Sequence, residues 1–318
     1  MSESEGDRRD APHSILPWIS ADEIFSRVSF ETAIRALQRE LRDGLEPSHD
    51  FRRTVLDVDS GQLLLMPSQS RRFVGVKVAT VAPKNPDVGM ARIQGTYLLM
   101  DAATLSPIAC LDGTALTTLR TPATSAAAAD YLAPDTVDHL VVFGSGPQAR
   151  GHIQAMATIR TLHRVTIVAR NQDRASALAR EVQAAGLVAQ TGVAADVRDA
   201  QVIVCATTAV SPLFDGTAPP DDSCTIAVGS HEPHVRELDS ALAARAQIVV
   251  EDVAVALRES GDVIIPIAEG ILQSSELIPL CDIITGTTGV DLSRPRIFTS
   301  SGMSWEDLVI AAEVYGNG

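Results

Sequence analysis

Lysine is the scarcest basic residue of this chain, and its two positions are the first candidates for chemistry. Of 26 basic residues, 24 are arginines, and only Lys77 and Lys84 are lysines. In residues 73–78, the alternation of a β-strand places Lys77 on the same face as Phe73 and Gly75. A partly desolvated ammonium has a tunable pKa and can bind a carboxylate or pass a proton. Lys77 is therefore a candidate catalytic residue, and a solvated lysine on an edge strand is the alternative.

Two arginines lie in comparable places. Arg53 opens a strand-like run just after residues 47–50, and Arg120 lies near the start of a helix rich in small residues, beside Thr121. A guanidinium can bind a carboxylate through two parallel hydrogen bonds. Taken alone, each arginine is more often a surface ion-pair residue than a ligand.

A glycine-rich turn is the sharpest short motif. It follows the apolar run 139–143, precedes a helical pattern over 150–159, and consists of Gly144, Ser145, Gly146, Pro147, Gln148 and Ala149. In a G-x-G-x-x-G/A turn the first glycine allows the tight turn, the second admits a pyrophosphate, and the last small residue lets helix and strand pack closely. The helix amides then bind the phosphates. The motif predicts a dinucleotide site, with an ordinary glycine-rich turn as the alternative.

The residues after the next strand bear on which dinucleotide binds. NAD-binding proteins usually carry an acidic residue about 20 positions after the motif. Here Arg170 and Arg174 occupy that region, and Asp173 lies several residues beyond the strand end. Arginines attract a 2′-phosphate, so NADPH is the expected cofactor and NADH the second choice. Two solvated arginines at a helix start are the alternative.

The elements that would position these residues change character along the chain. Apolar spacing predicts one or two helices ending near Gly44, β-type runs predict an antiparallel sheet between residues 52 and 107, and an Ala-rich helix is expected over 117–132. Strands and helices then alternate, with strand-like runs at 139–143, 165–168, 202–205, 225–228 and 248–250. The predicted fold class is α/β: a Rossmann-type doubly wound parallel sheet plus an N-terminal α+β domain.

The composition limits the classes of molecule that this protein is expected to bind. The 318 residues carry a net charge of −14, and a field of that sign disfavours nucleic acid and anionic membrane surfaces. The four cysteines are widely spaced without a Cys-x-x-Cys pair, and we expect reduced thiols and no metal site. No apolar run reaches the length of a membrane span, and residues 1–10 are polar. We therefore expect a cytoplasmic protein with a small-molecule substrate.

Four segments together resemble a known family. Residues 75–78, 111–125, 144–149 and 297–302 are similar to the ornithine cyclodeaminase and mu-crystallin family. The resemblance implies a substrate-binding and dimerisation domain over 1–122, a Rossmann domain over 123–301, and a C-terminal segment, 302–318, that returns to the first domain. It also implies a homodimer, whose subunits contribute β-sheet to a shared barrel. Residues 1–12 are polar and lack apolar periodicity, so we expect them to be a disordered tail.

The same resemblance implies the roles of the site residues. Arg53, Lys77 and Arg120 would surround the carboxylate of an imino or amino acid substrate, with Ser301 as a further substrate contact. Beyond the glycine-rich turn and the two arginines after the second strand, the expected cofactor contacts are Asn171, Thr207, Thr121, Val228, Gly229 and Ser300.

One departure from the family pattern bears on the reaction. Cyclodeaminases carry V-G-x-D-x-P-G-K-x-E-L, whose aspartate handles the amino groups of the substrate. Here His231 replaces that aspartate and Val235 replaces the lysine. An imidazole cannot stabilise an ammonium as a carboxylate does, although Glu232, one position away, keeps the cyclodeaminase reading open. His231 is a candidate for proton transfer, and a capping or second-layer role is its alternative.

These residues favour the reductase branch of the family. We predict NAD(P)H-dependent reduction of Δ1-pyrroline-2-carboxylate or Δ1-piperideine-2-carboxylate to proline or pipecolate. Three alternatives stay open: an ornithine or lysine cyclodeaminase, an alanine or opine-type dehydrogenase, and an NADPH-regulated binding protein for a small molecule.

Overall fold

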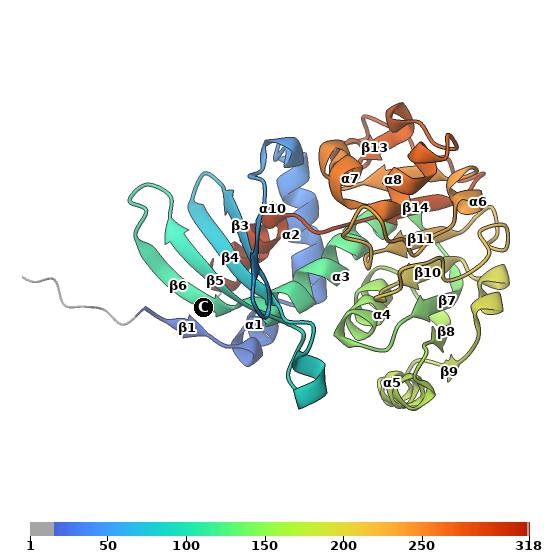
Figure 1. The fold of residues 1–318 in the computed structure, drawn as a ribbon, viewed down its shortest axis with the longest axis horizontal. Coiled ribbons are helices and arrows are strands. Elements are labelled where there is room, and N and C mark those ends of the chain that lie inside the picture. Colours follow the sequence, from blue (N-terminus) through green and yellow to red (C-terminus); the bar gives the residue numbers. More distant parts are fainter. Residues whose placement is uncertain (1–15, 317) are drawn as a thin grey trace, which may run out of the picture.

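The computed structural model describes residues 16–316 and 318, so the predicted tail lies outside the described part. Two sheets lie side by side, joined by the long helix α3 (Figure 1). The first sheet has the order β1-β6-β5-β4-β3-β2. Its strands are β1 (Trp18–Ile19), β2 (Thr54–Val58), β3 (Gly61–Gln69), β4 (Phe73–Val81), β5 (Ile93–Asp101) and β6 (Pro107–Asp112).

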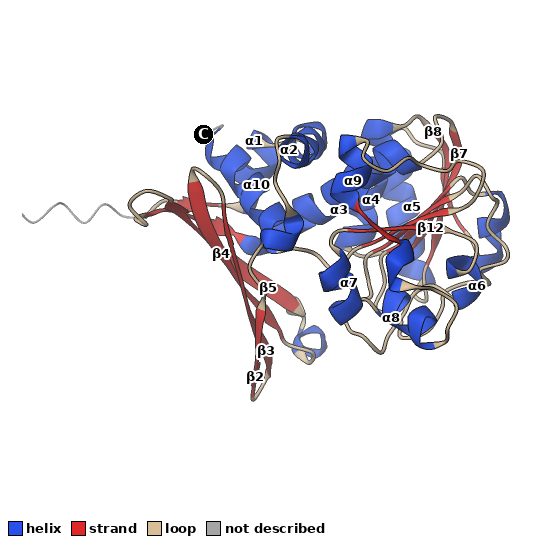
Figure 2. Cartoon of the chain, turned by 90° about the horizontal axis from the view of Figure 1, so that it is seen from above, coloured by secondary structure: helices blue, strands red, loops and turns tan. Residues whose placement is uncertain are grey.

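Helices cover one face of this first sheet, whose pairing is antiparallel as predicted, except that β1 runs parallel to β6. Figure 2 shows α1 (Ala21–Arg27), α2 (Phe30–Arg42) and α10 (Ser304–Gly316) on the same side. The opposite face is open, and Leu56, Val58 and Val78 are 45%, 51% and 37% exposed. The predicted homodimer stays a prediction.

Helix α3 (Gly113–Leu132) begins four residues before the predicted start. The Asp112 side chain accepts hydrogen bonds from the amides of Thr114 and Ala115, both at 2.9 Å, and this N-cap allows the earlier start. The sequence had suggested that Arg120 lies near the start of the helix, but the earlier start places it in the body of the helix. The predicted division after residue 122 falls inside α3, and the domain limits stay a prediction.

The second sheet is parallel throughout, in the order β13-β12-β14-β11-β10-β7-β8-β9. Its strands are β7 (Val137–Phe143), β8 (Leu162–Val168), β9 (Ala189–Thr191), β10 (Val202–Cys205), β11 (Cys224–Ala227), β12 (Gln247–Val250), β13 (Leu277–Pro279) and β14 (Arg296–Thr299). From β7 the strand order runs through β8 to β9 at one edge of the sheet, and β10 then lies on the other side of β7, so the strand order reverses between β7 and β10. Ligands of doubly wound sheets bind at such a point, beyond the carboxyl ends of the strands.

The strand count exceeds the five runs predicted from the sequence. The strands that were missed, β9, β13 and β14, contain at most two apolar residues each. The equally short β10, β11 and β12 contain three or four, which is why an apolar run marks them. All residues of β10, β11, β12 and β14 are buried, as expected for strands covered on both faces.

The remaining helices complete the second half of the molecule. They are α4 (Pro147–Ile159), α5 (Gln172–Ala184), α6 (Ser240–Ala243), α7 (Val253–Glu259), α8 (Gly261–Ala268) and α9 (Leu280–Thr285), with short 3-10 turns at 47–49, 85–88, 194–199 and 274–276. Within residues 16–316, no helix combines the length and apolarity needed to cross a membrane. The four cysteines are free thiols.

Candidate active site

Lys77 lies in the middle of β4 on the face that the helices cover. Residues 73, 75, 77 and 79 of this strand are buried, so the alternation predicted from the sequence is observed. Lys77 is 3% exposed, and its ammonium donates to Asp307 Oδ2 at 2.6 Å and to Thr117 Oγ1 at 3.3 Å. The pKa of Lys77 is lowered to about 8: burial is the main cause, Asp307 opposes it, and the charge of Arg120 acts in the same direction as burial.

Arg120 reaches the same carboxylate from α3. Its Nε donates to Asp307 Oδ1 at 3.2 Å and its Nη1 to Glu306 Oε2 at 2.5 Å. Arg120 is 5% exposed, and both acids are fully buried. The neighbouring carboxylates outweigh burial and raise the pKa of Arg120, so the guanidinium stays charged. Two buried cations thus share Asp307.

Arg53, which immediately precedes β2, approaches from the other side. Its Nη2 donates to the carbonyls of Ser301 and Gly302, at 3.1 and 2.6 Å, and pairs with Glu259 Oε2 at 2.6 Å. Gly302 has φ +79°, and a Cβ there would lie 2.6 Å from Nη1 of Arg120. This glycine turn brings Arg53 and Arg120 together, and the structure gathers all three predicted cations in one place.

Sequence reasoning missed the acids of this cluster. Glu306 and Asp307 open an otherwise apolar helix, where acids are ordinary because they complement the helix dipole. Glu251 follows β12 and is 3% exposed. It accepts hydrogen bonds from Ser300 Oγ at 2.5 Å and from the amides of Ser301 and Gly302 at 3.1 and 3.0 Å. A usable signal was the pair of acids directly before an apolar helical run.

The glycine-rich turn has the shape that a pyrophosphate requires. Gly144 has φ +115°, and a Cβ there would lie 2.4 Å from the Ala206 carbonyl oxygen. No atom lies within 4 Å of a Cβ built on Gly146, and the N-terminus of α4 has no side-chain cap. Open amides beside open space fit a bound phosphate. Ser145 lies between β7 and α4, whereas Pro147 and Ala149 already belong to the first turn of α4, which begins three residues before the predicted helical pattern.

A buried histidine fixes this turn against α3. His152 Nδ1 lies 2.7 Å from the Gln148 carbonyl oxygen, and its Nε2 lies 2.9 Å from Ser125 Oγ. Burial lowers the pKa of His152 to about 4. The ring is therefore neutral at pH 7, with Nδ1 as donor and Nε2 as acceptor.

The other predicted cofactor residues gather at the carboxyl ends of the parallel strands. Thr207 follows β10, Gly229 follows β11 after Val228, and Ser300 follows β14. Glu237, which the sequence did not single out, accepts from Thr207 N at 2.9 Å, Thr207 Oγ1 at 2.6 Å and Gly229 N at 2.7 Å. It braces two adjacent strand ends. Thr121 is half-buried on α3.

The two arginines after β8 are exposed, and their role in cofactor binding stays a prediction. Arg170 and Arg174 are exposed, and neither has an ion-pair partner among residues 16–316. Asn171 caps α5 by accepting from the Arg174 amide at 2.9 Å. The Asn171 side chain is thus used locally.

Comparison with known proteins gives the family. The ornithine cyclodeaminase/mu-crystallin family model matches residues 20–318. This chain belongs to that family. The predicted family and fold class are confirmed.

Named relatives in the ornithine cyclodeaminase/mu-crystallin family include reductases. A Delta(1)-pyrroline-2-carboxylate reductase of Bacillus cereus is 34% identical over 263 residues, covering 79% of this chain and 80% of that protein. The ketimine reductase mu-crystallin of Mus musculus is 32% identical over 267 residues, 83% of each chain. The structure of Thermococcus litoralis Delta(1)-pyrroline-2-carboxylate reductase in complex with NADH and L-proline has a TM-score of 0.89 at 27% identity, covering 95% of this chain and 97% of that one.

His231 stands apart from the cation cluster. The residue is exposed, and its Nδ1 lies 3.2 Å from the carbonyl oxygen of Gly229 in its own loop. Among the described residues, no hydrogen bond or ion pair joins it to Lys77, Arg53 or Arg120. Its role in proton transfer stays a prediction.

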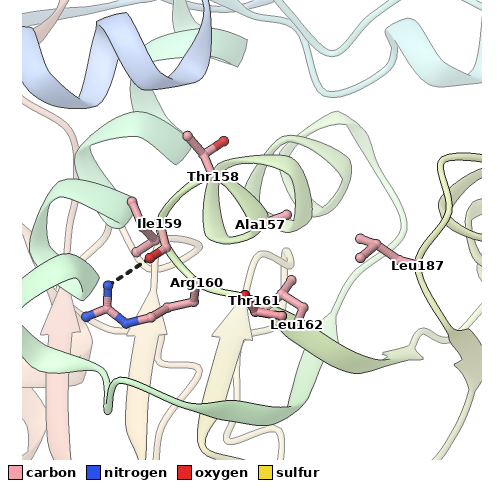
Figure 3. Close-up of a pocket in the computed structure, with 7 residues that line it drawn as sticks. All are labelled: Ala157, Thr158, Ile159, Arg160, Thr161, Leu162 and Leu187. Atoms are coloured by element: carbon pink, nitrogen blue, oxygen red, sulfur yellow. Dashed lines mark hydrogen bonds between the residues drawn. The ribbon is translucent and has the colours of Figure 1, made fainter.

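Two cavities bear on where a ligand could enter. One of about 420 Å³ opens at the end of α4, where Arg160 Nη1 donates to the Ile159 carbonyl (Figure 3), and none of the predicted site residues lines it. Another, of about 360 Å³, reaches Glu251 and is lined by Leu41, Gly44, Leu45, Glu46, Pro47, Ser48, Glu251, Asp252, Pro279, Cys281, Asp282 and Thr285. The second cavity borders the acid that holds the Ser300–Gly302 turn.

The shared carboxylate generates the first prediction. Asp307→Asn leaves Lys77 and Arg120 buried with less negative charge, and we expect the free energy of unfolding to fall by about 3–5 kcal/mol. Denaturant unfolding measures the loss. Glu181→Gln, in the exposed pair with Arg150, is the control and should cost less than about 1 kcal/mol. Equal losses in the two variants would contradict the prediction.

Proposed function

We propose that this protein uses NAD(P)H to reduce a small cyclic imino acid, Δ1-pyrroline-2-carboxylate or Δ1-piperideine-2-carboxylate, to proline or pipecolate. The observation that carries the proposal is the buried cluster in which Lys77 and Arg120 share Asp307. Cations held in fixed positions suit a compact carboxylate. The names of the relatives support the substrate class, and the Thermococcus litoralis complex holds NADH and L-proline.

In this proposal the chain binds and orients, and the cofactor carries the redox chemistry. When bound, the nicotinamide supplies a hydride to the carbon of a C=N bond. Lys77 and Arg120 hold the substrate carboxylate, which fixes the ring for reaction. With a pKa of about 8, Lys77 is mostly protonated at pH 7 and binds as a cation. The protonated imine is already electrophilic, so the protein needs no strong acid beside it.

The cyclodeaminase alternative has weaker support. That reaction needs a carboxylate near the amino groups of the substrate. The loop after β11 offers His231 at that position, and Glu232 beside it is exposed and lies 3.2 Å from His234. A carboxylate engaged with an exposed imidazole is a poor partner for a substrate ammonium.

Two assays separate these functions. NADPH oxidation with each cyclic imine tests the reductase, and ammonia release from ornithine with NAD tests the cyclodeaminase. We expect imine reduction and no ammonia. Ornithine turnover without imine reduction would overturn the proposal.

Lys77 gives a sharper prediction. Lys77→Met keeps much of the aliphatic volume but removes the charge, so kcat/KM for the imine should fall by about two to four orders of magnitude. In the unaltered enzyme, kcat/KM should decline as the pH rises through about 8, because the protonated form is lost. Steady-state kinetics from pH 6 to 9 measures both effects.

The second lysine supplies the control. Lys84 is exposed in the loop after β4 and makes no ion pair with the residues of the cluster, so Lys84→Met should leave kcat/KM unchanged. NADPH affinity should change little in either variant. Near-normal imine reduction by Lys77→Met would reduce Lys77 to an ordinary strand lysine.

Cofactor preference depends on other residues. We propose that Arg170 and Arg174 bind the 2′-phosphate of NADPH, since both are exposed beyond β8 without ion-pair partners among residues 16–316. Arg170→Asp should raise KM for NADPH about ten- to hundredfold, and KM for NADH much less. Arg180→Asp, exposed at the far end of α5, is the matched control. An unaltered enzyme that prefers NADH would contradict this assignment.

A further inference from the structure

The contact between Glu306 and Glu251 is not explained by the pairing of opposite charges. Glu306 is fully buried, and its Oε2 accepts from Arg120. Its Oε1 is also buried and has no donor among residues 16–316. Glu251 lies within hydrogen-bonding reach of this carboxyl group. Two buried carboxyl groups therefore face each other.

Two carboxylates in contact inside a protein do not both ionise, because their repulsion is unscreened. Glu251 accepts hydrogen bonds from three donors: Ser300 Oγ and the amides of Ser301 and Gly302. Glu306 has one donor, Arg120. Burial and the negative charge of Glu251 raise the pKa of Glu306 well above its usual value, against the opposing effect of Arg120. The proton belongs on Glu306.

We propose that Glu306 carries a proton at neutral pH, donates it in a hydrogen bond from Oε1 to Glu251, and thereby keeps the cation cluster able to accept a carboxylate. This hydrogen bond gives the orphaned Oε1 a partner. Glu306 and Glu251 are positioning residues, since neither has been placed against the substrate. The part of the inference that concerns the ligand rests on the proposed function.

Counting the charges shows what the proton does. The groups that face Glu306 come from four segments: Arg120 on α3, Lys77 on β4, Asp307 on α10 and Glu251 after β12. With Glu306 neutral, two cations face two carboxylates. Arg53, the third cation, is already paired with Glu259. With Glu306 ionised, a third carboxylate would leave the cluster anionic, and it would repel a substrate carboxylate at short range in a medium of low dielectric.

Neighbouring acids on one helix provide a matched test. Glu306→Gln preserves the shape and the neutral charge of the protonated acid, and its amide can donate to Glu251. We expect KM for Δ1-pyrroline-2-carboxylate at pH 7 to change less than fivefold and Tm to stay within about 3 °C. Asp307→Asn, one residue later, should lower Tm by about 5–8 °C. A rise in KM of fivefold or more for Glu306→Gln, or equal losses of Tm in the two variants, would overturn the proposal.

Infrared absorption locates the proton without any substrate. A protonated carboxyl absorbs above the amide I band, and at pH 8 Asp262, whose pKa is raised to about 7, is mostly ionised. The difference spectrum between the unaltered protein and Glu306→Gln should contain this band, shifted in D2O. If the variant does not fold, the unaltered protein must still show the band between pH 7 and 8, and its absence overturns the proposal. A protein that shows the band but reduces no imine would refute the proposed function and retain the proton assignment.

Discussion

The structure depends on one buried carboxylate that serves two cations. Moving an ammonium or a guanidinium out of water costs several kcal/mol, and only an opposite charge in good geometry offsets it. Asp307 provides that charge to Lys77 through one oxygen and to Arg120 through the other. These residues lie on β4, α3 and α10, with Asp307 separated from its partners by 230 and 187 residues. The end of the chain must therefore lie beside the first sheet for the cations to be buried at all.

The same requirement restricts the residues around the cluster. A Cβ at Gly302 would meet the Arg120 guanidinium, so this position of the turn between β14 and α10 has no room for a side chain. A Cβ at Gly75 would lie 2.1 Å from the hydroxyl of Tyr97, the residue opposite Lys77 in the sheet. Small residues at these positions allow the strand, the turn and the helix to come close enough for ion pairing. The close packing at these glycines is therefore a condition for the buried ion pairs to form.

The sequence predicted the features that a local pattern encodes. Strand alternation placed Lys77 on the covered face, and the βα context of Gly144 and Gly146 placed the turn correctly. The early start of α3 was missed because an apolar count does not register the Asp112 cap. Asp307 and Glu251 were missed for a deeper reason: an acid at a helix start or a strand end looks solvated until a distant cation is brought against it.

Helix α3 relates the two binding regions to each other. Thr117 Oγ1 accepts from Lys77, while the Thr117 carbonyl accepts from Gln148 Nε2 at 3.5 Å, at the glycine-rich turn. One turn later Arg120 projects into the cation cluster. Gly151 of α4 packs so closely on Pro122 of α3 that a Cβ would lie 2.7 Å from the proline ring. The turn and the cations are thus fixed to one rigid helix, in which each residue adds 1.5 Å. Because a reaction between two bound molecules is sensitive to displacements of about 1 Å, building both regions on α3 sets their separation through covalent geometry and not through flexible loops.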